Sequence, residues 1–167
     1  MGIDLELADC AAAGYRLSAC KEAGVPCGHE PDCRGEYRRA LAQAAADRPG
    51  EQYPHEFRYR RFADINEKMQ LIGMGYAAER EERVPGPEID ADLDWVSETV
   101  PGRTGIPGFK LLSNDRWLIT VREIDEALEA YARAPEHLRA EWEAEDKWAA
   151  WLEWLAVARR HGGFEAE

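Results

Sequence analysis

Hydrophobic residues recur at helical spacing most clearly between Pro135 and Phe164. Pro135 suits a first helical turn, because it has no N–H to leave unpaired there. Gly162 and Gly163 supply the backbone freedom that ends a helix, and Phe164 is placed to fold back on the last turn. The stretch holds four of the six tryptophans, with Trp154 off the main face. The pattern predicts one long helix whose buried face is Leu138, Trp142, Trp148, Trp151, Leu152, Leu155 and Ala158.

The first half of the chain alternates between short strand patterns and helical ones. Apolar and acidic residues alternate over 3–7, which predicts a half-buried strand, and a second short strand is expected at 15–17. Residues 20–33 combine three cysteines with prolines and glycines and are predicted as a loop. Helices are expected over 34–47, with Asp32 as N-cap, and over 61–72 with a frayed continuation over 76–83, and residues 51–59 fit an edge strand or an extended arm.

The second half begins with an ambiguous segment. Residues 88–100 fit either a strand with one acidic face or a short helix, and 101–108 form a loop. Residues 109–119 predict a hairpin, because two apolar runs flank a turn-forming Ser-Asn-Asp. Thr120 and Glu123 have the spacing of a capping box, so a helix is expected to begin there and to stop before Pro135.

These elements predict a mainly helical α+β fold in a single domain of 167 residues. It carries a small antiparallel hairpin or sheet and a long tryptophan-rich C-terminal helix. Within it we expect a strand and cysteine-containing loop over 1–33, a helical region over 34–83, an irregular acidic region over 84–108, and a hairpin with two helices over 109–167.

The net charge of −12 argues against general affinity for nucleic acid or anionic membrane. No apolar run approaches the length of a membrane span, and the acidic N-terminal residues do not match a signal peptide, so we expect a cytoplasmic protein. Residues 34–61 hold seven arginines against four acids, whereas 120–167 hold six bases against twelve acids. We expect the basic segment to pack beside the acidic helices. The alternative is an acidic surface for a basic partner protein, formed by Glu141, Glu143, Glu145, Asp146, Glu153 and Trp154 together with Asp90, Asp92 and Asp94.

The sharpest chemical signal is the group Cys20, Cys27, His29 and Cys33. Thiolates and imidazole at short spacing can enclose a tetrahedral zinc ion. The spacing C-x6-C-x-H-x3-C lacks the C-x2-C step of common zinc modules. The alternatives are ordinary reduced cysteines, which suit a cytosolic protein, and a catalytic Cys-His pair, which no flanking motif supports.

Three further motifs point to structure rather than to chemistry. The arginine and aromatic side chains of segment 55–62 could stack on bases, but inward packing of the aromatic residues is the simpler interpretation. We therefore expect no nucleic-acid binding outside this segment. The acids at 90, 92 and 94 resemble a calcium loop, but Trp95 and Pro101 stand where Gly and Glu are required. His161, before Gly162, suits a helix C-terminus.

Two stretches, SNDRWLITVREIDEALEAY at 113–131 and WLEWLAVARRHGGFE at 151–165, resemble segments of small bacterial and phage proteins. Those proteins open with Met-Gly and close with an aromatic helix followed by Gly-Gly-Phe. The resemblance implies an architecture and no catalytic residue.

Three functions follow as hypotheses. The first is a non-enzymatic acidic protein that binds or regulates a basic partner, as a phage- or host-interaction factor would. The sequence contains no catalytic motif that argues against this hypothesis. The second is a zinc-stabilised module. The third is an enzyme whose site is assembled from distant residues. No cofactor other than zinc is expected, and the oligomeric state stays open.

Overall fold

The computed structural model describes residues 2–24, 26–29, 32–60, 62–86, 93, 95–113 and 115–167. Asp90, Asp92 and Asp94 therefore lie outside the described residues, as does nearly half of the ambiguous segment 88–100. Within the described ranges no helix is both long and apolar enough to cross a membrane.

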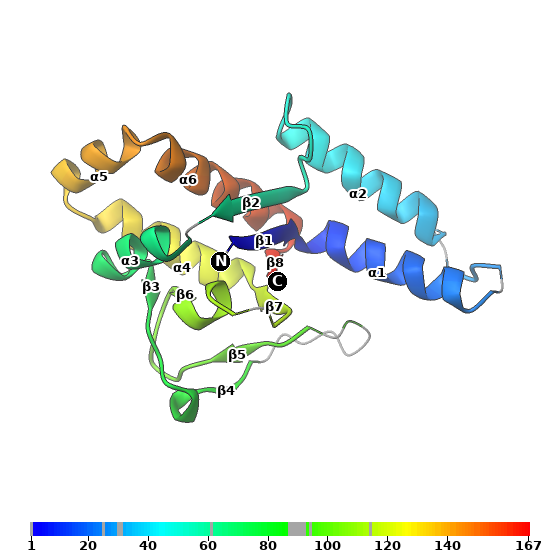
Figure 1. The fold of residues 1–167 in the computed structure, drawn as a ribbon, viewed down its shortest axis with the longest axis horizontal. Coiled ribbons are helices and arrows are strands. Elements are labelled where there is room, and N and C mark those ends of the chain that lie inside the picture. The colour runs from blue at the N-terminus through cyan, green and yellow to red at the C-terminus, as the bar shows by residue number, and fades with distance from the viewer. Residues whose placement is uncertain are drawn as a thin grey trace.

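The fold is α+β and mainly helical, as predicted (Figure 1). The α-helices are α1 (Ala8–Glu22), α2 (Cys33–Asp47), α3 (Phe62–Leu71), α4 (Val121–Arg133), α5 (Glu136–Glu143) and α6 (Asp146–Ala158). The strands are β1 (Gly2–Leu7), β2 (Glu56–Arg60), β3 (Gly75–Tyr76), β4 (Val84–Pro85), β5 (Glu98–Thr99), β6 (Ile106–Pro107), β7 (Trp117–Ile119) and β8 (Phe164–Ala166). Short 3₁₀ turns form η1 (Arg80–Glu82), η2 (Gly108–Leu111) and η3 (Arg159–His161).

The main sheet has the order β2-β1-β8-β7, and every neighbouring pair is antiparallel. Two small two-stranded sheets, β3-β6 and β4-β5, lie outside it. In the main sheet, strand β8 from the C-terminal end lies between β1 and β7, with Leu7 and Ile119 both in register with Phe164. The predicted strand at 3–7 and the edge strand within 51–59 are confirmed as β1 and β2.

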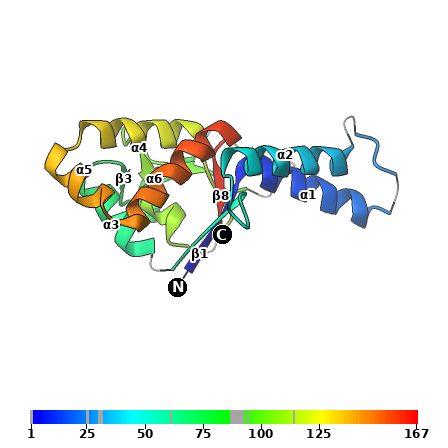
Figure 2. The ribbon, with the colours of Figure 1, turned by 90° about the horizontal axis from the view of Figure 1, so that it is seen from above.

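Helices α1 and α2 pack against each other and project together from the rest of the molecule (Figures 1 and 2). We call this pair the hairpin arm, and the chain between its helices forms the tip. Helices α3 to α6 gather on the other side of the main sheet (Figure 2). Helix α2 begins as predicted, because the Asp32 side chain accepts a hydrogen bond from the Gly35 N–H at 2.9 Å.

The predicted single C-terminal helix is wrong, because the chain bends at Ala144 and Glu145 between α5 and α6. Residues six apart on a continuous helix point about 120° away from each other. The bend lets Trp142 and Trp148 face the same core, where their rings meet edge to face at 5.3 Å. Packing of two large aromatic side chains therefore outweighs the continuity of the helix.

Trp154, predicted off the main face, is fully buried. Its ring lies 5.5 Å from the Phe57 ring and 6.0 Å from that of Phe164, and the Arg48 guanidinium stacks on it at 5.1 Å. Phe164 does return to the last helix, as predicted, but as the first residue of a strand.

Three further expectations are wrong. The hairpin at 109–119 is replaced by η2 and β7, because the buried Lys110 donates to the Leu118 carbonyl oxygen at 2.9 Å and to Glu123 at 2.7 Å. A side chain, rather than a strand pairing, thus joins these segments. The strand at 15–17 lies inside α1, whose buried alanines pack against the sheet. The expected helical continuation over 76–83 holds β3 and η1 instead, since Gly73 turns the chain with φ +77°.

The capping box at the start of α4 is confirmed, with Thr120 and Glu123 bonded reciprocally, and α4 ends before Pro135. The basic segment 34–61 packs beside helix α6 as expected, through Phe57 and Arg48 on Trp154, but Arg58 and Arg48 find their polar partners outside the acidic helices. Arg58 pairs with Glu56 of its own strand, and Arg48 donates to the carbonyl oxygens of Pro54 and Glu56.

His161 connects the body of the protein to the base of the hairpin arm. Its Nδ1 lies 2.8 Å from the Asp9 carboxylate of α1, and its Nε2 lies 2.9 Å from Asp47 of α2. His161 ends η3, the helix-terminal position expected from the sequence, and because its side chain is 1% exposed it also acts there as an interior clamp. The hydrogen bond to Asp9, followed by that to Asp47, raises the pKa of His161.

A stability test follows from this clamp. Because the pKa of His161 is raised in the folded state, its stabilisation is complete below about pH 6.5 and is lost as pH rises through the higher value. We expect His161→Gln to lower the free energy of unfolding by about 2 kcal/mol at pH 6. The difference should shrink by pH 9. Urea unfolding at both pH values measures it, and a pH-independent difference would contradict the charged clamp.

The two glycines after η3 offer a matched pair of variants. Both have positive φ, +79° at Gly162 and +103° at Gly163. A Cβ on Gly162 meets nothing within 4 Å, whereas one on Gly163 would lie 2.1 Å from the Ile119 carbonyl oxygen. We expect Gly162→Ala to destabilise the protein by about 1 kcal/mol and Gly163→Ala by at least about 3 kcal/mol. Urea unfolding of both variants tests this. Equal losses of stability would show that the approach of a Cβ at position 163 to the Ile119 carbonyl oxygen does not destabilise the fold.

Candidate metal centre

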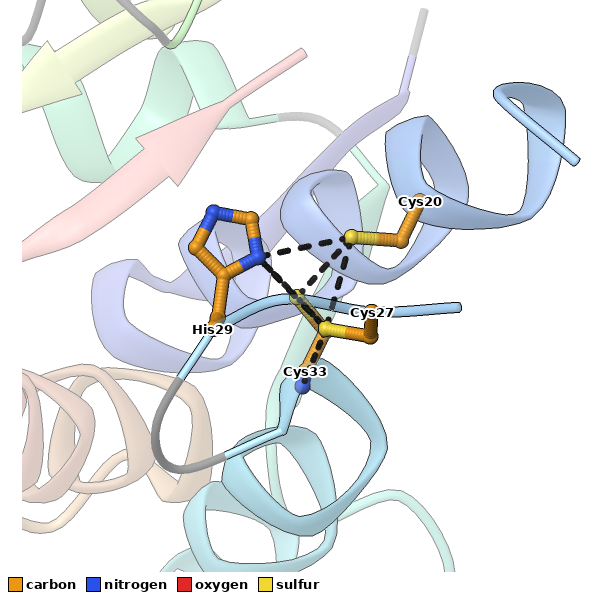
Figure 3. Close-up of side chains that lie close together, drawn as sticks. All are labelled: Cys20, Cys27, His29 and Cys33. Atoms are coloured by element: carbon orange, nitrogen blue, oxygen red, sulfur yellow. Dashed lines mark hydrogen bonds between the residues drawn. The ribbon is translucent and has the colours of Figure 1, made fainter. Parts of the chain in front are cut away.

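The structure brings together the four residues Cys20, Cys27, His29 and Cys33 at the tip of the hairpin arm (Figure 3). Cys20 lies near the end of α1, and Cys33 is the first residue of α2. Cys27 and His29 come from the chain between the two helices. The prediction of residues 20–33 as one loop is therefore wrong at both ends. Two of the candidate donors lie at helix ends and two on the connecting chain.

The four donor atoms form a nearly regular tetrahedron. The sulfur atoms of the three cysteines lie 3.2, 3.3 and 3.6 Å from one another. The His29 Nδ1 atom lies 3.3 to 3.5 Å from each sulfur atom. With Zn–S near 2.3 Å and Zn–N near 2.05 Å, tetrahedral coordination separates sulfur atoms by about 3.8 Å and sulfur from nitrogen by about 3.5 Å. A zinc ion fits after an expansion of a few tenths of an ångström.

The cysteines of the cluster are free thiols rather than a disulfide. A disulfide requires about 2.05 Å between sulfur atoms, which is far shorter than the separations here. The imidazole also points its Nδ1 atom at the same centre as the three sulfur atoms (Figure 3). Convergence of four donors on one point is the feature that separates a ligand set from cysteines buried as small hydrophobic side chains.

The backbone supports an anionic sulfur at Cys27. The Cys33 N–H, at the start of α2, donates to Cys27 Sγ at 3.3 Å. That hydrogen bond, with a second from the backbone of His29, lowers the pKa of the Cys27 thiol to about 6. Hydrogen bonds with Cys20 and Cys27 raise the pKa of Cys33, because its proton is shared with its neighbours. Thus one member of the set is ready to bind a cation as a thiolate near neutral pH.

The cluster is reachable from solvent. Cys33 is fully buried, Cys20 and Cys27 are half-buried, and His29 is exposed. All three cysteines line a hollow whose wall also includes Lys21 and Arg34. The fourth cysteine of the chain, Cys10, is elsewhere, fully buried in the core, where burial raises the pKa of its thiol. It is not part of the ligand set.

The five acids of the predicted partner surface that lie in the region of α5 and α6 are all exposed: Glu141, Glu143, Glu145, Asp146 and Glu153. Glu143 accepts a hydrogen bond from the Tyr131 hydroxyl at 2.5 Å, and Glu145 pairs with Lys68 at 2.6 Å, so both carboxylates already have partners in the fold. Trp154 is buried and cannot contact a partner. The Arg/aromatic segment 55–62 forms the edge strand β2, with Phe57 packed inward.

A second polar cluster, which the sequence pattern did not reveal, lies on the main sheet. The buried Glu165 carboxylate accepts hydrogen bonds from the Tyr15 hydroxyl at 2.7 Å, from Arg116 at 3.1 Å and from the Trp95 indole. Beside it, burial and then the charge of Glu165 raise the pKa of Glu6 to about 7. The Glu165 contacts join β8 to α1, to the residue just before β7 and to the segment before β5. We interpret this cluster as structural.

No protein family model, curated protein or solved structure matches this chain. The functional assignment therefore depends on the geometry of the Cys3His cluster.

Proposed function

We propose that Cys20, Cys27, His29 and Cys33 bind one structural Zn²⁺ ion and that the protein is built on a zinc-stabilised helical arm. The convergence of four donor atoms at tetrahedral separations supports this. Three thiolates and one imidazole suit zinc among the common divalent metals. Four protein ligands leave no open position for water or substrate, which is the arrangement of a structural site rather than a catalytic one.

The packing of the hairpin arm explains why a metal is needed. In α2 only Cys33 and Ala44 are fully buried. Cys33 is itself a proposed ligand, so helix α2 contributes little apolar surface to the core. Its attachment to α1 depends on half-buried contacts such as the Arg16–Glu36 ion pair at 2.5 Å. The His161 clamp holds the base of the arm, and zinc would hold the tip.

Metal analysis tests the zinc proposal directly. We expect about one equivalent of zinc per chain in protein purified without chelators. His29→Ala should lower the zinc affinity by at least about 100-fold, because three remaining ligands leave the site open. His137→Ala is the matched control, since His137 is another exposed histidine, located on α5, and should leave the affinity unchanged. Less than half an equivalent of zinc, together with equal zinc affinities for the two variants, would overturn the proposal.

Removal of the metal should destabilise the arm more than the body. A metal that binds only the folded state at 1,000 times its dissociation constant contributes about 4 kcal/mol. We expect a chelator to increase amide hydrogen exchange in α1 and α2 while β7, β8 and α6 stay protected. Uniform loss of protection over all these elements would instead indicate that zinc holds the whole fold.

A second candidate function is binding of a basic partner protein through the acidic surface of α5 and α6. It is favoured by the exposure of Glu141, Asp146 and Glu153. The test is binding to an immobilised lysine-rich peptide. We expect E141Q/D146N/E153Q to weaken this binding about tenfold at low salt. The matched control neutralises three exposed acids elsewhere, Asp4, Glu51 and Glu79. Equal weakening by both triple variants would show only an effect of net charge.

A further inference from the structure

Cys33 differs from the other two cysteines at the tip in access to solvent. Cys20 and Cys27 are both half-buried, and Cys27 lies between the helices and lines the hollow beside Lys21 and Arg34. Cys33 is fully buried, with its sulfur atom 3.3 Å from that of Cys27. An accessible cysteine sulfur next to a less accessible thiol is the arrangement in which oxidation leads to a disulfide.

We propose that the Cys3His cluster is a peroxide-sensitive site at which Cys27 is oxidised first and Cys33 closes a Cys27–Cys33 disulfide. The release of zinc in this reaction depends on the proposed zinc function. Formation of the disulfide depends only on the positions of the two sulfur atoms. The inference therefore assigns to the cluster a regulatory chemistry beyond its structural role.

The reaction balances in two steps with hydrogen peroxide as the oxidant. The Cys27 thiolate attacks one peroxide oxygen, so an S–O bond forms, the O–O bond breaks and hydroxide leaves. The Cys33 thiol then attacks the Cys27 sulfur, so the S–S bond forms, the S–O bond breaks, and the leaving hydroxide takes the Cys33 proton to form water. One thiolate and one thiol have lost two electrons in total, and one peroxide has been reduced to one hydroxide ion and one water molecule.

The position of each cysteine in the chain selects this pair. To bond, the sulfur atoms of Cys27 and Cys33 must approach from 3.3 Å to about 2.05 Å. Cys27 belongs to no helix, so the connecting chain can make this small movement. Cys20 lies as close to Cys33, at 3.2 Å, but it is carried by α1, and a bond there requires two helix ends to move together.

Zinc cannot remain bound after this oxidation. A disulfide removes two of the four donors, and Cys20 with His29 cannot hold a structural ion alone. The tip of the hairpin arm would then be closed by a short covalent loop from Cys27 to Cys33, with no side-chain cross-link from that loop to Cys20 of α1. Peroxide would thereby release α1 from the start of α2 while the His161 clamp still holds the base.

The experiment treats the full-length purified protein with one equivalent of hydrogen peroxide. Intact mass, peptide mapping and a zinc-binding dye are followed over time. We expect a loss of two mass units, a Cys27–Cys33 disulfide, and release of zinc at the same rate. Cys10 provides an internal control, since it is fully buried and should stay reduced. Dithiothreitol with added zinc should restore the starting state.

Two variants make the result decisive. Cys20→Ser should still form the Cys27–Cys33 disulfide whether or not it binds zinc, and Cys27→Ser should lose thiols at least about tenfold more slowly. Circular dichroism checks that both variants remain folded. A first disulfide that includes Cys20, or thiols that stay reduced, would overturn the inference. If the protein binds zinc and retains it after peroxide treatment, the proposed zinc function stands and the peroxide inference fails. If the Cys27–Cys33 disulfide forms in a protein that holds no zinc, the peroxide inference stands and the zinc function fails.

Discussion

The insertion of β8 between β1 and β7 is the constraint on which the rest of the structure depends. This strand has three residues, yet it pairs with both neighbours, and Phe164 at its start packs on Trp151 and Trp154 of α6. The turn that leads into it needs Gly163 in a left-handed conformation against the backbone of Ile119. The same short segment near the C-terminal end therefore completes both the main sheet and the aromatic core.

The same segment also holds the hairpin arm. His161 lies just before the turn and contacts Asp9 of α1 and Asp47 of α2, so the closing of the sheet and the anchoring of the arm are coupled. Among the residues that the structure describes, the far end of the arm makes no such contact with the core. It carries the Cys3His cluster instead, where the proposed zinc coordination would take the place of apolar packing. The molecule therefore has a large aromatic core and a projecting part that depends on polar contacts at both ends.

This division explains why the cluster is chemically exposed. Ligands within the main core would be shielded, as Cys10 is, whereas Cys20, Cys27 and His29 at the tip are within reach of solvent. A structural site at such a position is open to chelators and to oxidants, because the surrounding protein does not exclude them. The same exposure that leaves the site with little apolar packing also makes its side chains accessible to chelators and oxidants.

Local patterns in the sequence were sufficient to predict much of the fold and the members of the site. The caps at Asp32 and Thr120 act within one helical turn, so α2 and α4 begin where the sequence indicates. The residue types and short spacing of Cys20, Cys27, His29 and Cys33 marked them as candidate zinc ligands, because thiolates and imidazole are donors that zinc prefers, but they left ordinary reduced cysteines as an alternative. These features involve contacts between residues a few positions apart.

Only the tertiary structure decided where those donors lie and which surfaces remain free. Trp154 and the bend after α5 depend on aromatic rings from distant segments, and the interior clamp at His161 depends on acids more than a hundred residues away. The tetrahedral arrangement likewise requires α1 to extend to Glu22 and α2 to begin at Cys33, so that two helix ends face each other. Sequence alone determines local geometry and donor chemistry, but packing between distant segments determines burial and convergence, since these depend on contacts that no local pattern encodes.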